Sequence, residues 1–157
     1  MDELLGEFEC KLDGKGRLMF PAGLKRKLPE ASATRFVLNR GFEQCLMLYP
    51  VDTWKKIRKE ISRLNLYIKK NRDFVRYFYR GASEVELDGT NRLLIPKGLK
   101  KYAGIEKEVV VFAFVDRIEI WDREKYENLM NDEPEGYAEL AELTMGDKEP
   151  NIPEDVS

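Results

Sequence analysis

Apolar and polar positions follow a simple order at the start of the chain. Residues 8–12 alternate between apolar and polar, as on a half-buried strand, and residues 18–20 form a second short apolar run. Asp13-Gly14, which favours a tight reversal, lies between them. Pro21 ends the second run and fits the first turn of a short helix over residues 22–27. The pattern predicts strand, turn, strand and helix.

The next residues predict two more strands and a helix. Residues 36–39 and 45–49 are strand-like runs joined by a glycine-containing turn, and a helix follows over residues 51–64. The apolar residues of that helix recur at helical spacing and share one face: Trp54, Ile57, Ile61 and Leu64. A second helix is predicted over residues 72–79.

The same order of elements then occurs again. Residues 84–103 align with residues 9–28 at an offset of 75, and ten of the twenty positions are identical. After a three-residue shortening, the register resumes at an offset of 72 through residue 126, and the last strand of the second copy leads into a helix predicted over residues 123–130. The chain therefore contains one module twice.

A module of about 50 residues is too small to bury a good core alone, so we expect it to need its sister module, another subunit, or both. The predicted fold class is α+β, mainly β, with two tandem modules in a pseudo-two-fold duplication and flanking helices. The expected segments are a first module at 6–51, a helical connector at 52–80, a second module at 81–125, a C-terminal helix at 126–145 and an acidic, disordered tail at 146–157.

Charge is divided unevenly along the chain. The net charge is −2, but the last 27 residues hold nine acids and one lysine, so residues 1–130 carry a net +6. Residues 51–80 carry ten basic and three acidic side chains. This basic segment is either a solvated face that balances acids on a neighbouring subunit or a surface for phosphate contact.

The chain lacks the residues that most catalytic and metal sites need. It has no histidine, which excludes Ser-His-Asp and Cys-His systems and histidine metal sites. Two distant cysteines, Cys10 and Cys45, cannot form a zinc site, and we expect buried free thiols. No phosphate-binding loop is present, and the expectation is a protein that is not an enzyme and holds no metal or cofactor. Without a long apolar run or a signal-peptide pattern, a cytoplasmic location is expected.

Each module carries an Asp-x-x-x-Arg element, Asp13 to Arg17 and Asp88 to Arg92. The aspartate can cap the turn backbone and the arginine can close a local ion pair, which would hold the turn and nothing more. The repetition of the element with the following L-x-x-P-x-G-L-K favours a functional role.

These residues resemble the MraZ family, the two-module bacterial members of the AbrB-like, swapped-hairpin superfamily of transcription factors with small β-barrels. The resemblance covers about residues 6–143 in the family's order and is carried by five stretches: L-D-G-K-G-R-L-M-F-P-A-G-L from Leu12, F-V-L-N-R-G-F-E-Q-C-L-M-L-Y-P from Phe36, R-D-F-V-R-Y-F-Y-R-G-A from Arg72, E-L-D-G-T-N-R-L-L-I-P from Glu86 and R-I-E-I-W from Arg117.

The resemblance implies a sequence-specific transcriptional regulator associated with the nucleoid. It implies a homo-oligomeric ring that binds direct repeats of double-stranded DNA in the promoter of a division and cell-wall gene cluster. The DNA-binding residues it implies are Asp13, Lys15, Arg17, Asp88 and Arg92. In that role an arginine donates to guanine and Lys15 contacts phosphate.

The second element departs from the family's pattern. Thr90 stands where the first element has Lys15, and Asn91 stands where the family has glycine before the arginine. Asparagine tolerates the left-handed conformation, so the turn is expected to survive. Because a charge is lost, the first element is the stronger candidate for DNA contact and the second is expected to act mainly as scaffold.

Two other functions stay open. An antitoxin-like or scaffold protein of the same fold would bind a protein partner through the basic connector and the acidic tail. An enzyme that uses Asp13 or Asp88 as an acid or base is the weakest interpretation, because no nucleophile, metal cluster or cofactor loop accompanies these carboxylates.

Overall fold

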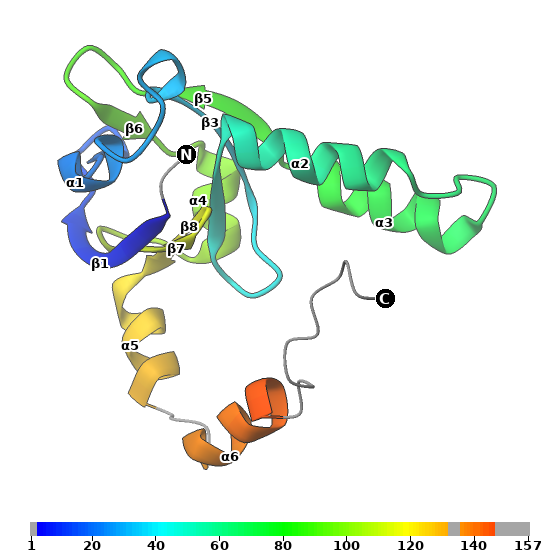
Figure 1. Cartoon of the computed structure of the whole chain (residues 1–157). Helices are drawn as coiled ribbons and strands as arrows, with labels where there is room; N and C mark the ends of the chain where they lie inside the picture. Colours follow the sequence, from blue (N-terminus) through cyan, green and yellow to red (C-terminus); the bar gives the residue numbers. More distant parts are fainter. Residues whose placement is uncertain (1–2, 132–135, 147–157) are drawn as a thin grey trace. The chain divides into compact units, whose positions relative to one another are not determined.

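The computed structural model describes residues 3–131 and 136–146 and divides the chain into two units, one through Tyr126 and one from Glu127 (Figure 1). In chain order the elements are β1 (Leu4–Lys11), β2 (Arg17–Met19), α1 (Ala22–Lys25), a 3₁₀ turn (Glu30–Ser32), β3 (Arg35–Arg40), β4 (Leu46–Pro50), α2 (Val51–Ser62), α3 (Lys69–Tyr79), β5 (Ser83–Glu86), β6 (Arg92–Leu94), α4 (Lys97–Ala103), β7 (Glu108–Val115), β8 (Arg117–Asp122), α5 (Arg123–Asn131), α6 (Tyr137–Ala141) and a π-helical turn (Glu142–Gly146).

The two modules exchange strands within the first unit. Its larger sheet has six antiparallel strands in the order β1-β7-β8-β4-β3-β5. The first strand of each module therefore pairs with the third strand of the other, β1 with β7 and β5 with β3. This confirms the predicted α+β fold of two tandem modules. Neither module has a complete sheet without its sister, in agreement with the expectation that a single module is too small.

β2 and β6 pair with each other and form a separate two-stranded ribbon, the β2–β6 ribbon. Its central pair joins Leu18 to Leu93, which are equivalent residues of the two modules. In the larger sheet, Met47 pairs with Glu119, again equivalent residues. An approximate two-fold axis therefore passes through both pairs, and it relates the first module to the second.

The core lies between the six-stranded sheet and the ribbon. Leu18 and Leu93 enter it at 2% and 1% exposure, beside buried leucines of α1 and α4. A second, smaller cluster covers the other face of β4 and β8, and its buried members are Cys45, Met47, Tyr49, Val110, Trp121 and Tyr126. Because apolar residues cover both faces, β4 is buried along its whole length instead of alternating.

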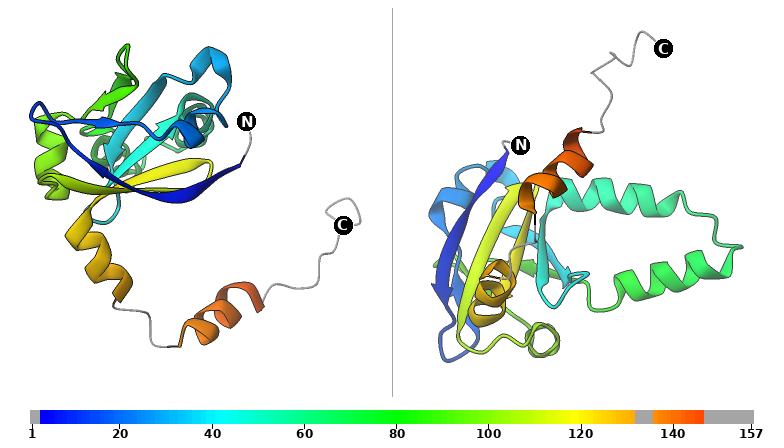
Figure 2. Two further views of the ribbon diagram at one scale, coloured as in Figure 1. Left: turned by 90° about the vertical axis from the view of Figure 1, so that its left-hand side faces the viewer. Right: turned by 90° about the horizontal axis from the view of Figure 1, so that it is seen from below.

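α2 and α3 form a helical hairpin that extends away from the sheet (Figure 2). Trp54 of α2 stacks on Phe78 of α3 with ring centroids 5.9 Å apart. Buried Asn39 donates to the Phe78 carbonyl, and the Arg40 guanidinium donates to the Tyr77 and Arg80 carbonyls. The end of α3 is thereby fixed to β3, while the loop between the helices exposes Leu66, Tyr67 and Ile68.

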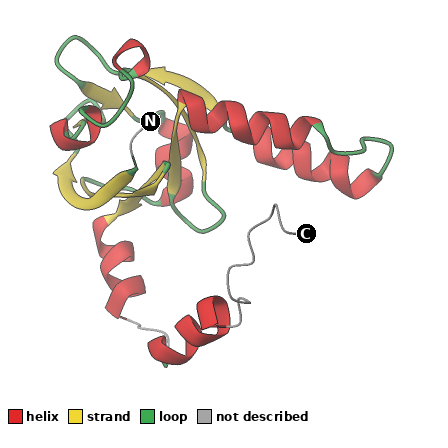
Figure 3. Ribbon diagram, in the orientation of Figure 1, coloured by secondary structure: helices red, strands yellow, loops and turns green. Residues whose placement is uncertain are grey.

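The second unit is helical in its described part, as the distribution of helices in Figure 3 shows. The helix predicted after the last strand, over residues 123–130, is confirmed, since α5 begins at Arg123 and ends at Asn131. Within the C-terminal helix predicted at 126–145, the described residues form the end of α5 and a second short helix, α6, which begins after left-handed Gly136. The tail predicted to be disordered lies, apart from Gly146, outside the described residues.

Other local expectations differ in their bounds or partners. β1 begins at Leu4, four residues before the predicted strand, because it runs along the whole of β7. The predicted reversal after Asp13 is present, but β2 meets the preceding segment only through a bridge between Leu12 and Leu18 and pairs with β6.

Both cysteines are free, as expected, and Cys45 is buried while Cys10 is half-buried. Burial raises the pKa of the Cys45 thiol to about 12.

The pairing of β2 with β6 predicts that alanine substitutions at adjacent positions of the ribbon differ sharply in their effect on the free energy of unfolding. Leu18→Ala or Leu93→Ala should lower the free energy of unfolding by about 2–5 kcal/mol, because each leaves a cavity on the two-fold axis. Met19→Ala and Leu94→Ala, on the exposed face of the same strands, should change it by at most about 0.5 kcal/mol. Urea denaturation measures all four. Equal losses at the inward and outward positions would contradict the described pairing.

Candidate nucleic-acid interface

The first Asp-x-x-x-Arg element is a turn organised around the carboxylate of Asp13. Its Oδ1 accepts from the backbone N–H groups of Lys15 and Arg17 at 2.9 and 3.0 Å. Its Oδ2 accepts from the Arg17 Nε at 2.8 Å. The Asp13 carbonyl also accepts from the Gly16 N–H, which closes the turn. One side chain therefore fixes both the loop and the arginine that follows it.

The second element repeats this arrangement. Asp88 accepts from the N–H groups of Thr90 and Arg92 at 2.9 and 3.0 Å and from the Arg92 Nε at 2.9 Å. The Thr90 hydroxyl adds a fourth donor at 3.0 Å. The substitution of lysine by threonine thus removes a charge from this turn and adds a hydrogen bond inside it.

Both turns need a left-handed residue directly before the arginine. Gly16 has a φ of 82° and Asn91 a φ of 62°. Asparagine tolerates this conformation better than other residues with a side chain. The prediction that the second turn survives without glycine is confirmed.

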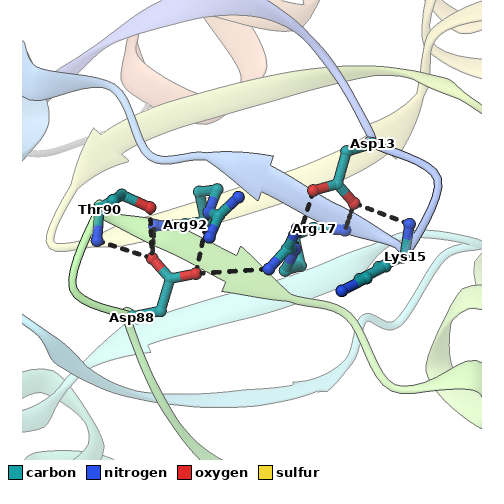
Figure 4. A network of polar contacts seen from close by, with 6 residues as sticks. All are labelled: Asp13, Lys15, Arg17, Asp88, Thr90 and Arg92. Carbon is teal, nitrogen blue, oxygen red and sulfur yellow. Dashed lines mark hydrogen bonds and ion pairs between the residues drawn. The ribbon is translucent and has the colours of Figure 1, made fainter.

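The approximate two-fold axis brings the two elements into one network (Figure 4). Arg17 Nη1 lies 3.9 Å from Asp88 Oδ2, so the first arginine contacts both carboxylates. On the outer face of the ribbon, Arg17 lies opposite Leu94 and Met19 lies opposite Arg92. The sequence did not predict this juxtaposition, because the two elements are 75 residues apart.

The carboxylates are anions in the folded protein. The backbone hydrogen bond from Arg17 is the largest cause that lowers the pKa of Asp13. The backbone hydrogen bond from Arg92, helped by those of Thr90, lowers the pKa of Asp88 to about 2. Each aspartate therefore stays a pure acceptor and orients its arginine at neutral pH.

Each arginine keeps donors for a ligand. The aspartate engages Nε, and the two terminal nitrogens of a guanidinium can donate in parallel to a planar pair of acceptors. The side chains of Arg17 and Arg92 are 24% and 33% exposed. Exposure therefore gives no reason to rank the first arginine above the second, and that ranking stays a prediction.

Further cations surround the network. Lys15 is exposed in the first turn, as a phosphate contact requires. Lys25 of α1 donates to the Asn91 side chain, so a lysine of the first module lies at the second turn. Lys25 was not among the residues predicted from the sequence, although its place in the repeated G-L-K, four residues after the proline, marked it as part of the duplication.

The groove beside α2 offers no comparable arrangement. A groove of about 430 Å³ lies between α2 and the edge strand β5, lined in part by Trp54, Lys55, Glu84 and Glu86, but it contains neither element. Within residues 3–131 and 136–146, no three or more carboxylates and thiols gather as a metal site would require. None of the helices in these ranges has the length and apolar character that a membrane crossing requires.

Comparisons with known proteins agree with the duplication. The family model of the MraZ protein, whose description calls it antitoxin-like, matches residues 4–77 and again residues 78–145. A protein of Christiangramia forsetii named transcriptional regulator MraZ is 46% identical over 93% of this chain and 95% of its own length. Proteins of the same name from Flavobacterium psychrophilum and Halothermothrix orenii are 45% and 36% identical, over 93% and 87% of this chain and 94% and 93% of their own lengths.

The turn geometry predicts an acid-sensitive interface. The lowered pKa values mean that ionised Asp13 and Asp88 stabilise the fold above their ordinary pKa near 3.8, and for Asp88 this stabilisation is lost as the pH falls through about 2. Carboxyl-carbon NMR should find Asp88 titrating near 2 and Asp13 below 3.8. Asp88→Asn should reduce the dependence of stability on pH between 4 and 2. Titration of Asp88 at or above 3.8 would contradict the observed hydrogen bonds.

Proposed function

The chain belongs to the MraZ family of transcriptional regulators, and we propose that it acts on transcription by binding double-stranded DNA through the outer face of the β2–β6 ribbon. The observation that carries the proposal is the pair of arginines that the two modules present together, each held by its own aspartate. The residues we assign to DNA are Asp13, Lys15, Arg17, Asp88 and Arg92.

The ribbon fits the major groove in size and chemistry. The groove admits a two-stranded β-ribbon, and arginine pairs with the O6 and N7 of guanine through two parallel hydrogen bonds. Asp13 and Asp88 hold each Nε by a hydrogen bond, and the terminal nitrogens, including the Arg17 Nη1 that lies 3.9 Å from Asp88 Oδ2, keep donors to read a base. The aspartates act by positioning the arginines, and each good arginine–guanine contact discriminates by about 1–3 kcal/mol.

Phosphate contacts supply affinity without sequence information. Lys15 is the exposed cation of the first turn, and Lys25 holds the second turn through Asn91. The paired aspartates cancel much of the arginine charge, so one chain offers few uncompensated cations at the ribbon. A single copy should therefore bind DNA weakly.

Assembly would compensate for weak binding by one copy. We propose a ring of identical subunits, as the family resemblance implies. Contacts in a ring are head to tail, so every subunit meets DNA in the same orientation and reads direct repeats. Avidity then raises affinity on the order of 10²–10⁴ when several boxes are engaged. The target we propose, from the resemblance, is the promoter of a division and cell-wall gene cluster, which implies association with the nucleoid.

The helical hairpin is the surface we assign to contact with a second copy. Its tip exposes Leu66, Tyr67 and Ile68, and Tyr67 is 95% exposed. Exposed apolar clusters that include an aromatic residue are typical of protein interfaces. The basic residues of α2 and α3 would then contact acidic residues of a neighbouring subunit, which is one of the two interpretations of the basic segment at residues 51–80.

Arg17→Ala tests the proposed DNA contact. Retention of promoter-repeat DNA should fall at least tenfold, because a bidentate base contact is lost, while the mass of the oligomer stays the same. Arg35→Ala, at an exposed arginine of β3 outside both the ribbon and the helical hairpin, is the matched control and should bind as the wild type does. Unchanged retention by Arg17→Ala would remove Arg17 from the interface.

The same retention assay separates the second candidate function. An antitoxin-like protein, the class that the family description mentions, would bind a protein partner through this fold. A DNA-binding regulator should lose affinity steeply as salt rises and should prefer repeat-containing DNA over scrambled DNA of equal length. Equal binding to the two DNAs would favour the protein-binding alternative.

Tyr67→Ser tests the proposed assembly surface. The variant should form smaller oligomers by light scattering, because an exposed aromatic at the hairpin tip no longer packs against another copy. The subunit should keep its fold and unfold cooperatively, since the side chain makes little contact with its own chain. Phe42→Ser, at a second highly exposed aromatic outside the hairpin, is the control and should leave the mass unaltered. An intact ring in Tyr67→Ser would exclude this residue from assembly.

A further inference from the structure

Two apolar side chains lie exposed in the middle of the proposed DNA-binding face. Met19 is 56% exposed and Leu94 is 54% exposed, and both belong to the β2–β6 ribbon. The approximate two-fold axis relates them, because they are 75 residues apart, the offset of the duplication. Each lies opposite an arginine of the other strand, Met19 opposite Arg92 and Leu94 opposite Arg17.

The fold does not account for these two side chains. Successive residues of a strand point to opposite faces, and the ribbon buries Leu18 and Leu93 in the core. Met19 and Leu94 therefore point outward with the arginines. A single exposed apolar residue is ordinary, but here both copies of the module place one at the same position of an otherwise charged face.

The major groove offers one apolar group that such side chains can contact. Arginine reads guanine there, and the C5-methyl group of thymine is the apolar group on the base edges. A ribbon that carries an arginine and an apolar side chain on each strand presents both complementary chemistries side by side. Methionine and leucine are both long enough to extend beyond the backbone of the ribbon toward a base edge.

We infer that Met19 and Leu94 are specificity-determining residues that contact thymine methyl groups next to the guanines read by Arg17 and Arg92. The inference rests on the proposed function and adds a base preference to it. The four outward side chains then form two arms related by the two-fold axis, each with one arginine and one apolar residue.

The arrangement also fixes the symmetry of the DNA word. A two-fold reading face matches a local dyad in the DNA, so the guanines and thymines contacted by one chain lie on both strands. The two arms are not identical. The first module has Met19 and Lys15 where the second has Leu94 and Thr90. One chain therefore reads an imperfect inverted word, and the ring repeats that word in one direction.

Replacing thymine by uracil removes the methyl group and leaves the hydrogen-bonding edge intact. The probe is a duplex that the wild-type chain selects from a random pool, with each thymine changed to uracil in turn. Wild-type affinity should fall about fourfold at each contacted thymine, which corresponds to one buried methyl group. Met19→Ala and Leu94→Ala should each lose the response at its own thymine and keep the response at the other.

Leu5→Ala serves as the control, because Leu5 is 72% exposed on β1 and lies outside the ribbon. It should bind and respond to uracil as the wild type does. Equal unfolding midpoints for the three variants would show that the changes act on binding.

The outcomes separate this inference from the function it rests on. If the wild-type chain selects no DNA, the proposed function and the inference both fail. If the wild type binds a selected duplex tightly but that duplex lacks thymine, DNA binding stands and the methyl contacts are excluded. The same conclusion follows if uracil has the same effect on the wild type and on both ribbon variants. Loss of the uracil response in the matching variant alone supports the inference.

Discussion

The pairing of β2 with β6 is the contact on which the proposed recognition face depends. Each strand has three residues, and their central pair, Leu18 and Leu93, closes the core on the two-fold axis. Because β1 and β5 each pair with a strand of the other module, the two turns cannot be formed independently of the whole unit. The hydrophobic core thus determines how far apart the two arginines lie, and the proposed DNA contact therefore has a fixed distance between its two arms.

The aspartates convert two flexible side chains into positioned donors. A free arginine loses rotamer freedom when it binds a base, whereas Arg17 and Arg92 are already held through Nε. The cost is charge, since each carboxylate offsets its arginine. Each copy therefore supplies specific contacts but little affinity, and several copies bound together supply the affinity. For this reason we propose that the ribbon acts within a ring that binds direct repeats.

The sequence predicted the parts of the fold that depend on local spacing. The repeated motif predicted both turns and the left-handed Asn91, and helical spacing placed Trp54 on the packed face of α2. It predicted that a module needs its sister, another subunit or both, but the particular pairs that join Leu18 to Leu93 and Lys25 to Asn91 were not predicted. Such pairs join residues more than 60 positions apart, and no periodicity within one module encodes them. The ranking of the first element over the second followed from charge alone, and the shared network gives it no support.

The central claim is that both modules read DNA through one two-fold face. Protection of guanine N7 from methylation on a selected duplex tests it most directly, with the wild type compared with Arg17→Ala and Arg92→Ala. The account predicts that each variant loses protection at a different guanine and that the two guanines lie on opposite strands. Protection that is unchanged in Arg92→Ala, or lost at the same guanine in both variants, would contradict it.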